Sequence, residues 1–176
     1  MLIQNYGLFW RREHVFWGRA GVLGHLQGYP ARAAFVVVDF REQQGVYVLY
    51  DDNFRPVYVG QAGANDKRRL FDRLKDHRND KLADRWTRFS WFGIRWVTAK
   101  SRLAAEAEGT HTTAGAVLDH IEAILISTIE PPHNRQGGRF GDNVIQYLQH
   151  RDEEELGPDQ DKMIRELWNQ AQSGQV

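Results

Sequence analysis

Alternating and β-branched runs of hydrophobic positions predict several strands in the first half of the chain. Gly45 to Tyr50 and Pro56 to Gly60 are two such runs, and they flank the turn residues Asp51 to Asn53, which predicts an antiparallel hairpin. Ala33 to Phe40 is a β-branched run before this hairpin, and Arg88 to Val97 alternates in part after it. We expect each of these two runs to form a further strand.

Helical periodicity appears between and after these strands. Arg68 to Arg78 places three apolar side chains on one helical face, and Ala114 to Ile129 is a strongly apolar segment ended by Pro131-Pro132. Val144 to Gln172 holds two amphipathic pieces parted by Gly157-Pro158. The pattern therefore predicts helices between and after the strands.

The N-terminal part carries a different pattern. Asn5 to Trp17 holds two aromatic runs around a charged centre, which predicts a β-hairpin, and Gly18 to Pro30 holds four glycines at spacings that match no nucleotide-binding loop, which predicts a linker. We therefore divide the chain into a β-rich N-terminal extension (1–44), a central domain (45–140) and an acidic helical tail (141–176).

Length and composition narrow the class of protein. A chain of 176 residues is long enough to bury one core, and its 41% hydrophobic and 26% charged residues lie in the range of globular proteins. The absence of cysteine excludes disulfide frameworks, thiol nucleophiles and zinc sites made from cysteine. The start of the chain lacks the apolar core of a signal peptide, and no run is long enough to span a membrane, so we expect a cytoplasmic protein without a membrane partner.

The charges are unevenly distributed, although the formal net charge is zero. Lys67 to Arg102 contains twelve Lys or Arg against four Asp, a balance of +8, and Asp142 to Asp161 contains seven acids against one Arg, a balance of −6. This division indicates either a basic face for phosphates with an acidic tail elsewhere, or two solvated helix faces.

Glu122 interrupts an apolar stripe in the helix predicted over Ala114 to Ile129. Apolar residues stand four before it and three, four and seven after it, so all share its side of the helix. A carboxylate buried among them would need a cation, a metal ion or a hydrogen-bonded partner. The alternative is an exposed helix edge that Glu122 shares with Asp119.

Arg73 and His77 stand four residues apart and share a face of the helix predicted over Arg68 to Arg78. An arginine fork suits bidentate phosphate contact, and an imidazole can move a proton near neutral pH. The alternative is a surface arginine paired with Asp72 or Asp76.

Five short motifs then follow one another in a fixed order. They are Gly45-Val46-Tyr47, Tyr58-Val59-Gly60, Arg73 with His77, Glu122, and Asn134 just after the two prolines. With the two tyrosines 11 positions apart, these motifs together resemble the GIY-YIG nuclease domain over roughly Gly45 to Phe140. The loop before Arg73 is longer than the family's commonest form, so Arg68 or Arg69 could take its place.

The resemblance implies an α/β (α+β) fold, with a small, mainly antiparallel sheet of three strands flanked by helices. It would carry the N-terminal hairpin as an extension and the C-terminal helices as a tail. It also implies that the catalytic residues gather on one face: Tyr47, Tyr58, Arg73, His77, Glu122 and Asn134.

The same resemblance implies a role for each of these residues. Glu122 would hold a single Mg²⁺ or Mn²⁺ ion, which binds oxygen ligands and water, while Arg73 would stabilise charge at phosphorus. Tyr47 would act as general base or orient a water as hydroxide, and Tyr58 would position the water or the phosphate. His77 would assist proton transfer. Asn134 would brace the site.

The implied activity is metal-dependent cleavage of nucleic acid, most simply DNA, in restriction or in antiphage or prophage defence. Basic residues around the arginine helix would contact the polymer: Lys67, Arg68, Arg69, Lys75 and Arg78. The alternative is a non-catalytic module that uses the same face to bind nucleic acid or protein. Either the N-terminal or the C-terminal extension could also mediate a homodimer or hold a partner subunit.

Overall fold

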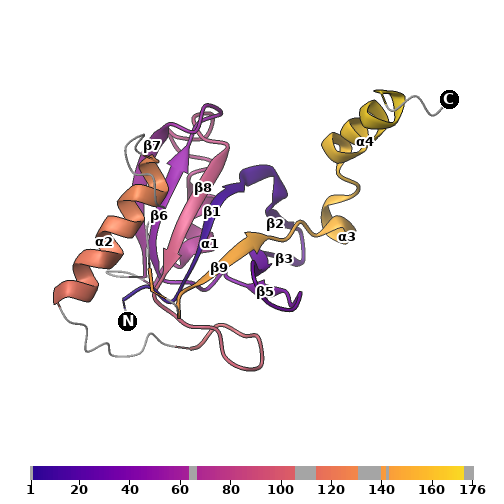
Figure 1. Cartoon of the computed structure of the whole chain (residues 1–176). Helices are drawn as coiled ribbons and strands as arrows, with labels where there is room; N and C mark the ends of the chain where they lie inside the picture. The colour runs from indigo at the N-terminus through magenta and orange to yellow at the C-terminus, as the bar shows by residue number, and fades with distance from the viewer. Residues whose placement is uncertain (1, 64–66, 106–113, 131–139, 142, 173–176) are drawn as a thin grey trace.

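The computed structural model describes residues 2–63, 67–105, 114–130, 140–141 and 143–172 (Figure 1). Its helices and strands, in chain order, are β1 (Asn5–Arg11), the 3-10 turn η1 (Arg12–His14), β2 (Phe16–Arg19), β3 (Val22–His25), β4 (Gln27–Pro30), β5 (Val38–Asp39), β6 (Gly45–Tyr50), β7 (Pro56–Ala62), α1 (Leu70–Asp76), β8 (Arg88–Gly93), α2 (Ala114–Ile129), β9 (Ile145–Gln149), α3 (Glu153–Leu156) and α4 (Gln160–Gln172). None of these helices is long and apolar enough to cross a membrane.

Seven strands form one large sheet in the order β5-β4-β9-β1-β8-β6-β7. All neighbouring strands are antiparallel except β1 and β9, which run parallel. The predicted mixture of helices and a mainly antiparallel sheet is therefore confirmed. The predicted size is wrong, because β1, β4, β5 and β9 extend the expected three strands to seven.

The extra strands come from segments whose partners are distant in sequence. The N-terminal hairpin is not formed as predicted, because β1 pairs with β8 and β9, while β2 pairs with β3 in a separate two-stranded sheet. The predicted linker contains β3 and β4, and the first of the two C-terminal amphipathic pieces contains β9 followed by α3. Strands from all three predicted segments of the chain thus pair in the same sheet.

The two faces of the sheet carry separate cores. Consecutive strand residues point to opposite faces, so Val46 and Tyr47 lie on different sides. Tyr47 belongs to a large cluster that includes Leu70 and Leu74 of α1, whereas Val46 packs with Ala123 of α2. Figure 1 accordingly shows α2 crossing one face of the sheet and α1 on the other.

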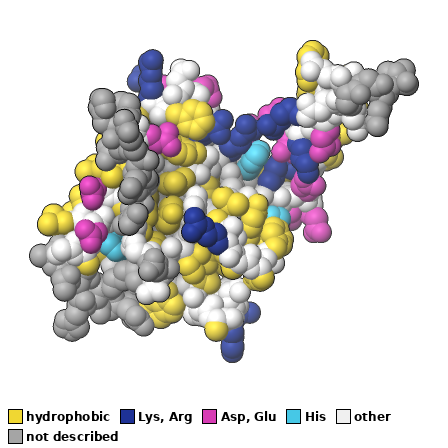
Figure 2. Space-filling view, viewed as in Figure 1, with side chains coloured by type: hydrophobic (Ala, Val, Ile, Leu, Met, Phe, Trp, Pro, Cys, Tyr) yellow, Lys and Arg dark blue, Asp and Glu magenta, His cyan; other side chains and the backbone are white. Residues whose placement is uncertain are grey.

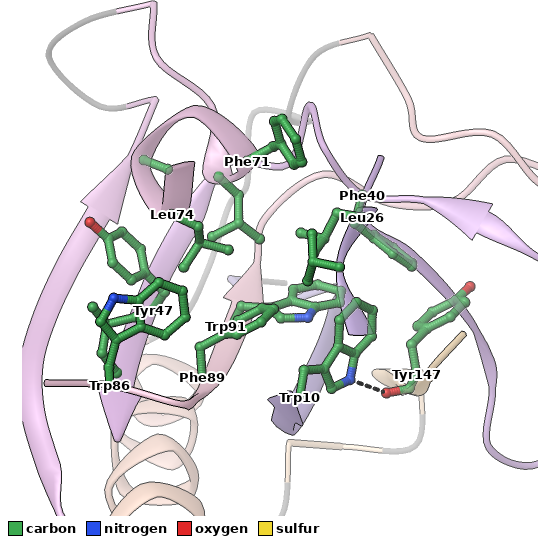
Figure 3. Packing of buried hydrophobic residues seen from close by; sticks show 14 of the residues in the cluster. Trp10, Leu26, Phe40, Tyr47, Phe71, Leu74, Trp86, Phe89, Trp91 and Tyr147 are labelled. Atoms are coloured by element: carbon green, nitrogen blue, oxygen red, sulfur yellow. Dashed lines mark hydrogen bonds between the residues drawn. The ribbon is translucent and has the colours of Figure 1, made fainter. Parts of the chain in front are cut away.

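Aromatic side chains fill the core on the α1 face (Figure 3). Trp10 and Trp91 meet edge to face at 5.3 Å between ring centroids, in the space over Gly7, where a Cβ would stand about 2.5 Å from either indole nitrogen. The Trp10 indole also donates a 3.1 Å hydrogen bond to the backbone carbonyl of Tyr147. This contact fastens β1 to β9 at the side-chain level, in addition to their backbone pairing.

Candidate functional site

Three side chains on the α1 face form a continuous hydrogen-bonded chain. The Tyr47 hydroxyl, on β6, lies 2.8 Å from Nε2 of His77, and His77 Nδ1 lies 2.7 Å from Oδ2 of Asp80. An ionised carboxylate only accepts, so His77 Nδ1 carries a proton and donates it to Asp80. Nε2 of the neutral imidazole is then the acceptor for the Tyr47 O–H. We call this arrangement the Tyr-His-Asp chain.

The protonation states of the two ends follow from their surroundings. Burial raises the pKa of Asp80, but hydrogen bonds from the Leu82 N–H and from His77 outweigh it, and the net shift is downward. Burial raises the pKa of Tyr47 well above its ordinary value, and Tyr58 raises it further, although the Arg73 charge acts in the opposite direction. Asp80 is therefore ionised and Tyr47 protonated at neutral pH, as the Tyr-His-Asp chain requires.

Tyr58 is an exposed tyrosine that lies beside the buried Tyr47. Its side chain on β7 is 37% exposed, whereas that of Tyr47 is 1% exposed. The Tyr58 ring lies edge-on to His77 at 4.7 Å between centroids, and its side chain is hydrogen-bonded to that of Tyr47. Of the two tyrosines, Tyr58 is therefore the one that solvent can reach.

Gly60 explains why a tyrosine fits at position 47. Tyr47 and Gly60 are directly paired across β6 and β7. A Cβ on Gly60 would overlap the hydroxyl and Cζ of Tyr47. The third residue of the Tyr58-Val59-Gly60 motif therefore makes room for the tyrosine of the first motif, which is a steric reason for finding the two motifs together.

Helix α1 brings Arg73 and His77 to this cluster. The helix is anchored through Leu70, whose N–H donates to the backbone oxygen of Gln43 at 3.0 Å. His77 is the residue at the C-terminal cap of α1, and Arg73 lies one turn earlier. The positive charge of the Arg73 guanidinium lowers the pKa of Tyr47. The structure therefore brings together four of the six predicted catalytic residues: Tyr47, Tyr58, Arg73 and His77.

Glu122 lies elsewhere. It is exposed on α2, which packs on the opposite face of the sheet from Tyr47. The inner side of α2 is taken by residues such as Ala123 and by His120, whose Nδ1 accepts a 3.1 Å hydrogen bond from the Ile3 N–H. The apolar stripe around Glu122 is the outer one, with Leu118 65% and Leu125 51% exposed. The exposed-edge alternative therefore describes this residue.

The described residues do not assemble a metal site beside Tyr47. Among them there is no group of three or more His, Asp or Glu side chains that could hold a metal ion. Glu122 is separated from the Tyr-His-Asp chain by the sheet, and Asn134 lies outside the described residues. The geometry accordingly does not fit the metal arrangement that the family resemblance implies.

Some of the residues predicted to contact nucleic acid interact with other residues of the chain. Lys67 and Lys75 are exposed, and Arg68 forms an ion pair with Asp76. Arg69 lies 3.9 Å from a carboxylate oxygen of Glu42. Arg78 is half-buried, and its guanidinium lies over the ring of Trp17.

The sequence interpretation missed Asp80. It was counted only in the charge balance, yet it is the residue that fixes the tautomer of His77. The available signal was its position three residues after the histidine, which brings the two side chains together where the chain turns at the end of α1.

None of the protein-family models, curated proteins or solved structures compared with this chain matches it. The resemblance to GIY-YIG nucleases therefore depends on the five motifs alone.

Proposed function

We propose that this chain is an endonuclease of the GIY-YIG kind that hydrolyses phosphodiester bonds in nucleic acid, with DNA as its polymer. The observation that carries the proposal is the Tyr-His-Asp chain, with Tyr58 at its solvent end and the Arg73 charge acting on it. Such a set can remove a proton from water and stabilise negative charge, which are the two requirements of phosphodiester hydrolysis.

The order of proton movements follows from burial. Tyr58 is the exposed hydroxyl, so an attacking water gives its proton to Tyr58, which passes its own to Tyr47, and Tyr47 passes its own to His77 Nε2. The imidazolium that results is stabilised by Asp80. The water oxygen bonds to phosphorus, the bond from phosphorus to the 3′ oxygen breaks, and the departing 3′ oxygen takes up a proton from solvent water. The products would be a 5′-phosphate and a 3′-hydroxyl.

Dependence on Mg²⁺ or Mn²⁺ is a separate part of this proposal. It is supported by the family resemblance at Glu122 and not by the position of that residue, so no step above passes through a metal ion. A divalent ion in such enzymes screens the charge of the phosphate and of the leaving oxygen.

Cleavage assays test both parts. We would incubate the wild type with supercoiled plasmid, linear duplex, single-stranded DNA and RNA, each with Mg²⁺, Mn²⁺ or EDTA. His77→Ala and Tyr58→Phe are expected to lower the cleavage rate by about 10²- to 10⁴-fold, as for loss of acid–base catalysis. Glu122→Gln tests the metal part. Tyr50→Phe is the matched control, since Tyr50 is a buried tyrosine of the same strand on the opposite face.

The outcomes separate the alternatives. Cleavage that is lost in His77→Ala and in EDTA, and kept in Tyr50→Phe, supports the enzyme. If Glu122→Gln cleaves at the wild-type rate with Mg²⁺, Glu122 is not the metal ligand. If no polymer is cut by the wild type with any metal ion while oligonucleotides still bind, the face belongs to a binding module and the catalytic proposal fails.

A further inference from the structure

A polar hollow lies apart from Tyr47, where β1 and η1 meet the start of β8 and the C-terminal helices. It encloses about 580 Å³ and is lined by four arginines: Arg11, Arg12, Arg78 and Arg88. Trp17, Trp86, Asp52, Glu13 and Asp161 also line it. Figure 2 shows Lys and Arg side chains gathered in the recess where the C-terminal helices leave the body of the molecule. We call this hollow the arginine pocket.

Three of the four guanidinium groups lie over aromatic rings. Arg12 lies 4.8 Å from the centroid of Trp86, and Arg78 lies 4.7 Å from that of Trp17. Arg88 lies 4.6 Å from the ring of Phe54. Stacking fixes the plane of a guanidinium and leaves its N–H groups pointing sideways, so less conformational entropy is lost when an anion binds.

The charges in the arginine pocket are only partly compensated. Arg11 is paired with Glu13 at 2.7 Å and with Asp161 at 3.5 Å. Arg12, Arg78 and Arg88 form no ion pair with any residue in the described part of the chain. Burial lowers the pKa of Arg78, and the Arg12 charge lowers it further, so these two cations repel each other. An anion between them would relieve this repulsion.

The arginine pocket is connected to the Tyr-His-Asp chain through adjacent residues. Arg78 directly follows His77, and Trp86, on which Arg12 stacks, donates a 3.0 Å hydrogen bond from its indole nitrogen to the His77 carbonyl. A ligand held by Arg12 and Arg78 would thus lie next to the segment that carries His77.

The chemistry of the pocket points to phosphate groups carried on a strand. Planar guanidinium forks suit the oxygens of phosphate, and 580 Å³ is more room than one phosphate ion needs. The ring of Phe54, which is 48% exposed beside Arg88, offers a surface on which a base can stack. We propose that the arginine pocket binds the phosphate backbone of the nucleic-acid strand that is cut at Tyr58 and the Tyr-His-Asp chain. This inference rests on the proposed nuclease function.

Binding measurements in EDTA test this inference without cleavage. The probe is a fluorescein-labelled oligonucleotide, single- or double-stranded, followed by anisotropy against salt concentration. Arg78→Gln/Arg88→Gln should raise Kd at least tenfold and lower the slope of log Kd against log salt by about one per lost phosphate contact. The matched control is Arg102→Gln, an exposed arginine outside the pocket. Thermal melting shows whether each variant is folded, and Arg88→Gln alone is the fallback if the double variant is not.

Each result decides one question. If the pocket variants bind the oligonucleotide as tightly as Arg102→Gln does, the inference is overturned, and wild-type cleavage would leave the nuclease proposal intact. If inorganic phosphate displaces the oligonucleotide at a concentration comparable to that of the oligonucleotide, the pocket binds a small phosphate compound. The proposal that it binds a nucleic-acid strand is then wrong. If binding depends on the pocket but the wild type cuts no polymer, the pocket stands and the nuclease proposal fails.

Discussion

At the scale of single residues, Gly60 determines whether the Tyr47 hydroxyl can reach His77. Gly60→Ala would place a methyl group against the end of the Tyr47 ring, so we expect a loss of about 1–3 kcal/mol in the free energy of unfolding from overpacking. Cleavage should fall with it, because the tyrosine must move away from Nε2. Urea unfolding and plasmid cleavage measure the two effects.

The control for this substitution is Gly115→Ala on α2, where an added Cβ meets no atom within 4 Å. An alanine there should leave stability unchanged or raise it by roughly 0.4–1 kcal/mol, because it restricts the unfolded chain and favours helix. Equal effects of the two alanines would contradict the steric role of Gly60.

The buried tyrosines predict how stability depends on alkaline pH. Burial raises the pKa of Tyr47 above 10.0 and that of Tyr50 to about 12. A group whose folded pKa is raised contributes stability fully below its unfolded pKa and loses it as pH rises through the folded pKa. The free energy of unfolding should therefore decrease above about pH 10.

Tyr47→Phe and Tyr50→Phe should each make this decrease less steep between pH 10 and 12, because each removes one proton that the folded state retains. Urea unfolding at a series of pH values gives the slope. A slope that neither phenylalanine changes would mean that these hydroxyls ionise as readily in the folded state as in the unfolded state.

At the same scale, the sequence predicted some site residues and missed others for physical reasons. Tyr47, Tyr58 and His77 could be associated because strand pairing and a helical turn fix their relative positions. The position of Glu122 could not be predicted, because α2 is apolar on both its inner and its outer side. Periodicity shows which residues share a side of a helix, but not which of two apolar sides faces the sheet.

At the scale of elements, the outer side of α2 is an apolar surface in contact with solvent. Leu118→Gln and Leu125→Gln should change the free energy of unfolding by no more than about 0.5 kcal/mol, because both side chains are already largely exposed. Ala123→Gln, on the inner side of the same helix, should cost several times more, since a polar group would be forced into the core. Thermal melting of the three variants compares the two sides.

Large losses in both leucine variants would mean that this side of α2 is covered. In either case the comparison also gives the orientation of Glu122, which lies between Leu118 and Leu125 along that side.

Element boundaries were predicted best where the signals were local. The helix over Ala114 to Ile129 and the β6–β7 hairpin are formed as expected, because periodicity, turn residues and the proline pair act on adjacent residues. The N-terminal aromatic segment was predicted to be a hairpin; it contains the strands β1 and β2, but these two do not pair with each other. Asn5 pairs with Gly93 on one side and Ile145 on the other, and no local pattern specifies contacts at such separations.

At the scale of the whole molecule, the sheet predicts which fragments can fold. A fragment of residues 45–140 would lack β1 and β9, and with them Trp10 of the central core. We expect it to have no cooperative unfolding transition in near-ultraviolet circular dichroism. A fragment of residues 1–159, which loses only α4 and the residues after it, should keep the wild-type transition, because α4 is exposed along its length.

A cooperative transition in the 45–140 fragment would show instead that the predicted central domain is an independent folding unit. This comparison therefore tests the division of the chain that the sequence indicated.

The position of β1 also has a consequence for the time course of folding. β1 leaves the ribosome before its partners β8 and β9, which begin about 80 and 140 residues later. Until β8 and β9 have been synthesised, the aromatic side chains and both edges of β1 remain uncovered. The sheet can therefore close only late in synthesis and through long-range pairing, which slows folding.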